Sequence, residues 1–330
     1  MSGVTDELEN FMAIDIGWSG ILVGNGASLT MSGCFAYHSL FDQAKTVEPP
    51  LTATDISIFD QLQTKNFEQV LSALNQARSI NGVLGLEHQT IIDSYTRIQT
   101  ALIQSVHGVH LSWDSIPEEN LLSVRQALLA YDYVYSTNYD LLLYWAVNKD
   151  SNGFKDFFWG GHFDLGNTEI WDKVTKLLFL HGGLHLYKTL HGTYKRKAEG
   201  YNNLLDLFGT PIPDEQDAVP LFVTEGTSAD KLKSIYSNDY LSFAYNRFAN
   251  HHGPLVILGQ SLDSTFDKHL IDALRSGPNR TLGIGIHRGL RTPTEIIQAK
   301  TNFYIKLSGF EFHFFDSASH PLGDPALHSA

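Results

Sequence analysis

Three short apolar runs in this chain each end abruptly in glycines or small polar residues, and this repeated ending constrains the fold more than any other feature. Gly20 to Val23 leads into Gly24–Ser28 (GNGAS), and Tyr131 to Tyr135 leads into Ser136–Asp140 (STNYD). A later run stops at His181-Gly182. Open α/β folds bind their ligands outside the carboxyl ends of parallel strands. The pattern therefore predicts a nucleotide lying across the carboxyl edge of such a sheet.

The remaining sequence alternates between strand and helix patterns. The stretch from about 50 to 130 contains apolar residues at helical spacing, as in Ile91, Tyr95, Ile98 and Leu102, and no convincing strand. We predict a single α/β domain over residues 1–330, with a doubly wound, mostly parallel, Rossmann-like sheet and a helical insertion at about 50–130 after the first strand. The later runs assigned to this sheet are Pro220 to Thr224, Pro254 to Leu258, Thr281 to Ile286, Phe303 to Leu307 and Phe310 to Phe315. The stretches expected to have little order are the tail after Ser317 and the loop 210–217.

Composition narrows the class of protein. The chain has 330 residues and a formal net charge of −13, which argues against the clustered cations that a nucleic-acid footprint needs. Its one cysteine, Cys34, can form no internal disulfide and no CxxC pair, so a reducing compartment is expected. The first ten residues are acidic, unlike a signal peptide, and the apolar runs fall short of a membrane helix. We expect a soluble, cytoplasmic protein with no membrane contact.

Each motif has a structural and a functional interpretation. The glycines of Gly24–Ser28 allow a tight turn, or they allow backbone N–H groups to approach a pyrophosphate. Ser136–Asp140 can cap a helix, or Asn138 can hold a ribose hydroxyl or a water beside the Asp140 carboxylate. His181 is either an interior histidine or a proton acceptor. The segment 225–227 could close the site from another side, although a helix cap at Thr227 is the favoured interpretation.

The histidines do not form a recognisable metal motif. His181, His185 and His191 lack an HExxH arrangement, and the residues between them alternate as in a strand. We therefore predict no metal site and no zinc.

Taken in order, the motifs resemble those of the sirtuin-like NAD-binding superfamily. The set comprises the GxGxS loop, the TxNxD-like element, the HG pair and Gly259-Gln260-Ser261 after a late strand, and it spans roughly residues 18 to 290. The chain looks most like a bacterial branch of stand-alone proteins. The resemblance implies that Asn138 lies at the nicotinamide ribose, that His181 is the catalytic base and that Asp140 contacts the carboxamide. It also implies that NAD is bound by Gly24, Asn25, Gly26, Ser28 and Thr137, with Gly259 and Ser261 on the adenosine side.

One departure from the family changes the expected reaction. Sirtuin deacylases carry a zinc module built from four cysteines, whereas this chain has only Cys34. The resemblance therefore favours the bacterial sirtuin-like effectors, many of them anti-phage proteins, that hydrolyse NAD to nicotinamide and ADP-ribose. A non-catalytic sensor of NAD or of an ADP-ribose derivative is the alternative, and a deacylase is disfavoured. Self-assembly into a homo-oligomer and activation by a protein trigger stay open.

Overall fold

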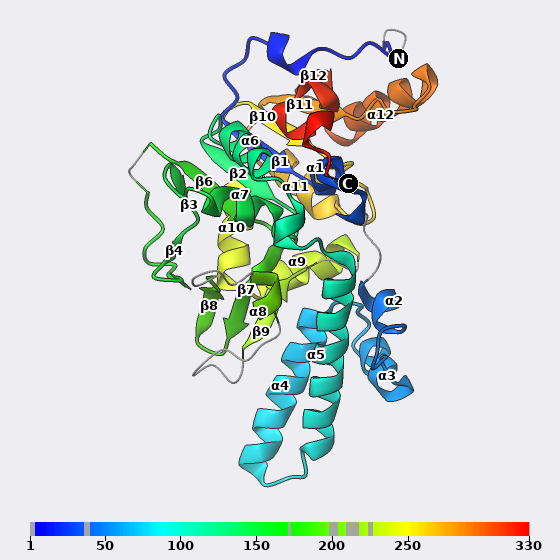
Figure 1. Cartoon of the computed structure of the whole chain (residues 1–330), viewed down its shortest axis with the longest axis vertical. Coiled ribbons are helices and arrows are strands. Elements are labelled where there is room, and N and C mark those ends of the chain that lie inside the picture. The colour runs from blue at the N-terminus through cyan, green and yellow to red at the C-terminus, as the bar shows by residue number, and fades with distance from the viewer. Residues whose placement is uncertain are drawn as a thin grey trace.

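A seven-stranded parallel sheet forms the centre of the protein. The computed structural model describes residues 4–35, 40–170, 173–197, 204–208, 218–223 and 227–329. The strand order is β12-β11-β10-β1-β2-β6-β3, and every neighbouring pair is parallel (Figure 1). The predicted doubly wound α/β fold is confirmed. The strands are β1 (Gly20–Val23), β2 (Tyr133–Ser136), β3 (Phe154–Lys155), β6 (Thr175–Phe179), β10 (Leu255–Leu258), β11 (Thr281–Ile286) and β12 (Glu311–Asp316).

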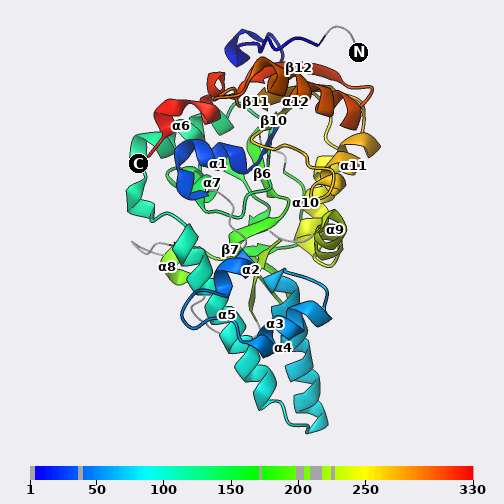
Figure 2. The ribbon, with the colours of Figure 1, turned by 90° about the vertical axis from the view of Figure 1, so that its right-hand side faces the viewer.

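The chain winds outward from β1 in both directions. It first adds β2, β6 and β3 on one side of β1, and it later adds β10, β11 and β12 on the other side. The strand order therefore reverses between β1 and β10, and such a switch point is where open α/β sheets bind ligands. Helices cover both faces of the sheet (Figure 2). One face carries α1 (Asn25–Met31), α6 (Glu118–Leu128) and α7 (Leu142–Asn148), and the other carries α10 (Asp239–Ala249) and α11 (Lys268–Ser276).

A second, antiparallel sheet lies beside the first. Its five strands run in the order β4-β5-β8-β7-β9. The run Pro220 to Thr224 was expected in the parallel sheet, but its described part is β9, which pairs antiparallel with β7. An apolar run does not distinguish the two kinds of sheet, so this prediction was wrong. The elements are β4 (Phe158–Trp159), β5 (His162–Phe163), β7 (Gly182–Thr189), β8 (Gly192–Lys195) and β9 (Val219–Phe222), with α8 (Leu204–Leu207) and α9 (Ser228–Tyr236) nearby in the chain.

The insertion between β1 and β2 is helical, as predicted. Its helices are α2 (Leu40–Ala44), α3 (Ala53–Gln61), α4 (Phe67–Leu84) and α5 (Gln89–Val109). The α4 and α5 helices form a hairpin that projects away from the sheet (Figure 1). Apolar residues at the base of the hairpin, such as Leu71 and Ile98, belong to the same buried cluster as the residues of β1.

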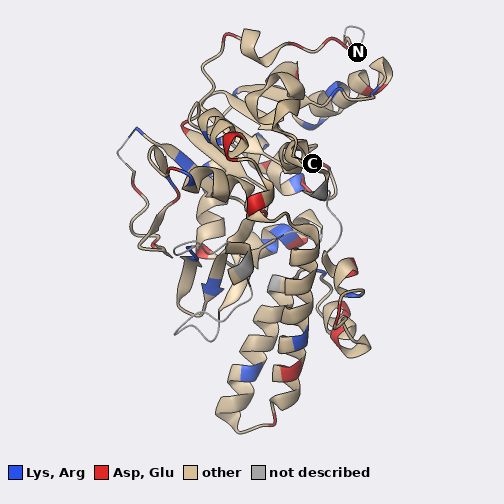
Figure 3. Cartoon of the chain, in the orientation of Figure 1, with Lys and Arg blue, Asp and Glu red and all other residues tan. Residues whose placement is uncertain are grey.

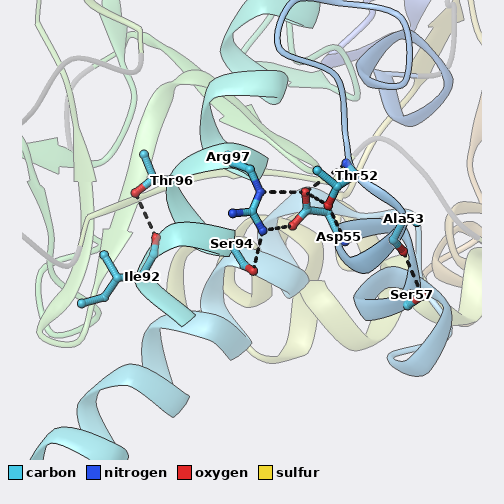
Figure 4. A network of polar contacts seen from close by, with 8 residues as sticks. All are labelled: Thr52, Ala53, Asp55, Ser57, Ile92, Ser94, Thr96 and Arg97. Atoms are coloured by element: carbon cyan, nitrogen blue, oxygen red, sulfur yellow. Dashed lines mark hydrogen bonds and ion pairs between the residues drawn. The ribbon is translucent and has the colours of Figure 1, made fainter. Parts of the chain in front are cut away.

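A buried ion pair ties α3 to α5 (Figure 4). The Arg97 guanidinium donates to both carboxylate oxygens of Asp55, at 2.9 Å and 3.1 Å. Asp55 also completes a capping box with Thr52 at the start of α3. Burial alone would raise the pKa of Asp55, but the hydrogen bonds from Arg97 and Thr52 hold that pKa below its usual value.

Two other expectations were wrong. Phe303 to Leu307, expected as a strand, covers the last turn and the end of α12 (Pro293–Lys306), which begins at a capping box formed by Thr292 and Glu295. The tail after Ser317 is not disordered but forms three short 3-10 turns. His320 fixes this tail, because its ring bonds the Tyr131 hydroxyl at 2.7 Å and accepts from the Leu322 N–H. The loop 210–217 lies outside the described residues.

Lys and Arg are scattered over separate elements of the chain (Figure 3). No helix in the described part of the chain is both long enough and apolar enough to cross a membrane.

Candidate functional site

Two glycine turns meet at the switch point between β1 and β10. Gly24 precedes α1, and Gly259 follows β10 with a φ of +71°. A Cβ on Gly24 would lie 2.6 Å from the Gly259 carbonyl oxygen, and one on Gly259 would lie 2.4 Å from the Ala27 nitrogen. The N–H groups of Gly24 and Gly26 donate to the carbonyls of Leu258 and Gly259. These glycines are therefore required for close backbone packing, and their amides are used within the protein.

A cavity of about 870 Å³ opens beside the glycine turns. This volume is within the range of about 300–1,000 Å³ that is usual for small-molecule sites. Of the predicted NAD-binding residues, Gly26, Gly259 and Ser261 line the cavity, whereas Gly24, Asn25, Ser28 and Thr137 are outside its lining. The other walls come mainly from the ends of β10 and β11 and from α12.

A buried polar cluster, Ser28–Asn138–Asp140, lies behind Gly24. Asn138 Nδ2 donates to Ser28 Oγ at 2.9 Å and to the Gly24 carbonyl at 3.2 Å. Ser28 Oγ in turn donates to Asp140 Oδ2 at 2.8 Å. The Ser28 hydroxyl is thus used inside the cluster, since it holds both Asn138 and Asp140.

The amide of Asn138 has a fixed orientation and an unused acceptor. Its side chain is only 1% exposed, and its Oδ1 has no hydrogen-bond partner among the described residues. The two bonds made by Nδ2 prevent the amide from turning over. A buried acceptor without a partner costs about 1–3 kcal/mol, so a group that donates to Oδ1 would be stabilised here.

Asp140 is held in a nearly enclosed position. Burial raises its pKa, against the opposing effects of His110 and of hydrogen bonds from Ser28 and the Leu142 N–H. His110 lies at the end of α5, where its Nε2 accepts from the Leu141 N–H at 3.0 Å, and burial lowers its pKa. His110 was not predicted as a site residue, because no sequence motif links the end of the helical insertion to the STNYD element.

His181 follows β6 and faces a second histidine. Its Nε2 lies 2.8 Å from Nε2 of His269 on α11. His269 Nδ1 lies 3.0 Å from Ser228 Oγ, which accepts from the His269 N–H at 2.6 Å. His269 was not predicted as a site residue, because the amphipathic pattern of α11 already accounts for it as a core position.

Both histidines are neutral. Burial lowers the pKa of His181 well below its usual value and lowers the pKa of His269 to about 3, and the charge of Lys231 adds to both effects. Two neutral rings whose Nε2 atoms face each other share one proton between those atoms. The Nε2 of His181 is thus engaged with His269 in this structure, and the His181 side chain is 4% exposed.

The segment 225–227 was expected either to close the site or to cap a helix, and its described residue, Thr227, caps a helix. Thr227 forms a capping box with Asp230 at the start of α9, while residues 225 and 226 lie outside the described part of the chain. Tyr240 is buried, and its hydroxyl accepts from the Phe179 N–H. These residues therefore support the helix cap rather than a wall of the site.

The described residues contain no group of three or more His, Cys, Asp or Glu side chains placed to hold a metal ion. His185 is buried against the rings of Tyr144 and Phe179.

Comparisons with known proteins place the chain in a family. The model of a family described as "Domain of unknown function (DUF4917)" matches residues 21–322. No curated protein matches the chain.

Solved structures of Sir2 proteins are similar over most of the chain. One described as "Structural Basis for the Mechanism and Regulation of Sir2 Enzymes" has 12% identity and a TM-score of 0.36, covering 88% of this chain and 95% of the other. "Structure of Sir2Tm bound to a propionylated peptide" has 12% identity and a TM-score of 0.34, covering 89% and 95%. "Sir2-p53 peptide-NAD+" has 12% identity and a TM-score of 0.34, covering 88% and 94%.

Proposed function

This chain belongs to the DUF4917 family, and we propose that it binds NAD at the switch point of its sheet and hydrolyses the bond between nicotinamide and ribose. The observation that carries this proposal is the buried Asn138 amide, which is locked by Ser28 and Gly24 with its Oδ1 unused. A ribose hydroxyl or a water is the kind of donor that such an oxygen accepts.

The cavity supports the binding step. It adjoins the glycine turns at the reversal of strand order, the position where open α/β folds hold dinucleotides. Gly26, Gly259 and Ser261 supply a close backbone surface and a hydroxyl for the phosphates and the adenosine half. Asn138 is outside the lining of this cavity, and we propose that the nicotinamide end extends from the cavity toward it.

Cleavage of the bond between nicotinamide and ribose requires no strong general acid. As the bond from C1′ to the pyridinium nitrogen breaks, its electron pair neutralises the nicotinamide, and positive charge develops on the ribose. A water oxygen adds to C1′ and loses a proton, which yields nicotinamide and ADP-ribose. Asn138 Oδ1 orients the ribose or the water, and the buried Asp140 carboxyl supports the cluster that holds that amide. His181 accepts the proton once its Nε2 is free of His269.

Nicotinamide release from NAD tests this function. We expect turnover in the unaltered protein and at least a tenfold loss in Asn138→Ala, since one oriented hydrogen bond is worth roughly 1.5 kcal/mol or more in such a site. Asn250→Ala is the matched control, because Asn250 is an exposed asparagine after α10 that bonds only within its own helix. Equal rates in the protein and in Asn138→Ala would refute the role of Asn138.

A binding protein without turnover is the second candidate. It is favoured by the contact of His181 Nε2 with His269 Nε2, which leaves the proposed proton acceptor occupied. Calorimetric binding of NAD or ADP-ribose without any nicotinamide release would support a sensor instead of a hydrolase.

A further inference from the structure

We propose that a second, smaller cavity of this protein binds a neutral molecule that carries a single aromatic ring and an amide group. The cavity has a volume of about 190 Å³ and shares no described lining residue with the cavity at the glycine turns. Its lining comes mainly from α7, β6 and the segment 154–159, together with His185 of β7 and Lys195 of β8. The inference is therefore independent of the proposed function.

The walls of this cavity are mostly aromatic. An apolar cavity of about 150 Å³ is large enough to bind benzene. The volume of about 190 Å³ therefore suits one ring with a small substituent. The flat faces of aromatic side chains pack well against a flat ligand. The aromatic residues of the lining are Tyr144, Phe154, Phe157, Phe158, Trp159 and Phe179.

The backbone at Phe157 brings three successive side chains into the lining. Side chains of an extended segment alternate between opposite sides, yet Asp156, Phe157 and Phe158 all line the cavity. Phe157 has a φ of +67°, which a bulky residue rarely adopts. It is 4% exposed, and its ring packs against Phe243 with the centroids 4.9 Å apart. The segment thus keeps a costly conformation that gives the cavity both a carboxylate and aromatic rings.

His185 gives the cavity a buried polar group with an unused nitrogen. The residue is 1% exposed, and its Nδ1 has no hydrogen-bond partner among the described residues. Burial lowers its pKa to about 3 and the charge of Lys195 adds to this effect, so the ring is neutral. The Nδ1 edge of the ring faces Gly183, since a Cβ there would lie 3.0 Å from Nδ1. The opposite edge, which carries Nε2, is therefore the one left to line the cavity.

The unused Nδ1 indicates which ring nitrogen of His185 carries the proton. A neutral imidazole has one N–H donor and one acceptor. Buried N–H groups without a partner are rarer than buried acceptors without one, so we assign the proton to Nε2. His185 then presents an N–H donor to the cavity, and a ligand carbonyl is an acceptor that this donor can bind.

The charged residues of the lining, Lys155, Asp156 and Lys195, favour a ligand without net charge. Asp156 and Lys195 form an ion pair, with side chains 25% and 15% exposed, so their charges compensate each other. Lys155 is exposed and its ammonium lies 5.5 Å from the centre of the Trp159 ring, so solvent and salt screen its charge. A primary amide matches this arrangement, because its NH₂ group can donate to Asp156 while its carbonyl accepts from His185.

A titration of the full chain with benzamide, benzoate and toluene, followed by NMR of the probes, tests this inference. The probes share one ring and differ in the group attached to it. We expect benzamide to bind with a Kd of about 1 mM or below, roughly tenfold more tightly than benzoate or toluene. Equal binding of toluene would refute recognition of the amide, and tighter binding of benzoate would refute the neutral ligand. If none of the probes binds, the site itself is refuted.

The variant His185→Phe tests the proposed donor. It keeps an aromatic ring and removes the N–H, so benzamide affinity should fall roughly tenfold while toluene affinity changes by less than about twofold. His162→Phe is the matched control, because His162 is an exposed histidine of the same antiparallel sheet outside the cavity lining. Equal benzamide affinity in the two variants would overturn the role of His185. The comparison of probes on the unaltered protein decides the proposal even where His185→Phe does not fold.

Discussion

At the scale of single residues, the site depends on side chains whose hydrogen bonds are almost all made inside the protein. Asn138 is the exception, because its Oδ1 has no partner in the described structure. His181 shows the opposite situation, since its Nε2 already contacts Nε2 of His269 at 2.8 Å. Of the two residues proposed for catalysis, only Asn138 can accept a hydrogen bond from a ligand without a change in its neighbours.

Burial lowers the pKa of His181, His269 adds to this effect, and removing His269 tests both contributions. In His269→Ala, we expect the pKa of His181 to rise toward its usual range near 6.5, because water reaches the ring and the unfavourable effect of His269 on protonated His181 disappears. The His181 resonance followed by NMR through a pH titration measures this shift. His252→Ala is the control, as His252 is an exposed histidine elsewhere. An unchanged His181 titration would show that the neighbouring ring has no such effect.

The substitution Gly259→Ala tests whether the protein needs the close approach of the two glycine turns. An alanine there would combine a φ of +71° with a Cβ only 2.4 Å from the Ala27 nitrogen. Gly309→Ala is a matched control, because Gly309 has a φ of +94° but nothing within 4 Å of an added Cβ. Each substitution costs roughly 1–2 kcal/mol for the backbone conformation, and Gly259→Ala should lose substantially more. Equal melting temperatures of the two variants would show that the contact is not needed.

At the scale of elements, the ion pair between Asp55 and Arg97 positions the helical insertion. Asp55→Asn removes the charge that accepts from Arg97 and should lower the free energy of unfolding by about 2 kcal/mol in a urea titration. Asp60→Asn, on the exposed side of α3, should change it little. Because the pKa of Asp55 is lowered, its stabilisation exists above about pH 4 and is lost as the pH falls through the folded value. A loss no larger in Asp55→Asn than in Asp60→Asn would contradict this role.

Elements were predictable from sequence where one signal dominated. The short strand β1, followed at once by Gly24, and the apolar spacing of α5 gave correct elements. The strand expected at Phe303 to Leu307 failed, because the apolar residues Phe303 and Leu307 are also one helical turn apart in α12. The sheet that receives β9 could not be predicted, since pairing depends on partners far away in the sequence.

At the scale of the whole molecule, the motifs predicted which strand ends meet but not what their side chains contact. The convergence of Gly24 with Gly259 follows from parallel topology, and the sequence indicated it. The contacts of Asn138 with Ser28 and of His181 with His269 depend on rotamers and on helix packing across the sheet. No local pattern specifies them.

Buried neutral histidines make the stability of the whole protein sensitive to acid. Their folded pKa values lie below the unfolded value of about 6.5, so the unfolded chain binds more protons as the pH falls, and stability present above about pH 6.5 is lost toward about pH 4. Burial raises the pKa values of Asp140 and Asp267, and these two groups act in the opposite sense. The histidines are His181, with a pKa well below 6.5, His251, with a pKa of about 4, and His185, His269 and His320, with pKa values of about 3.

Melting temperature measured from about pH 7 to about pH 5 checks this dependence. We expect a steady fall, with each histidine contributing up to about 1.4 kcal/mol per pH unit. His320→Gln should show a shallower fall, because one titrating group has been removed. A melting temperature that does not change over this range would contradict the assignment of these histidines as neutral in the folded state.

We propose that the unused oxygen of Asn138 receives a hydrogen bond from the nicotinamide ribose, or from the water that attacks it. A crystal structure of the protein with bound dinucleotide tests it most directly. We predict a ribose hydroxyl or an adjacent water within about 3 Å of Asn138 Oδ1, with the phosphates beside Gly26 and Gly259. A dinucleotide bound away from this cluster, with Asn138 Oδ1 satisfied by another protein group, would contradict the account.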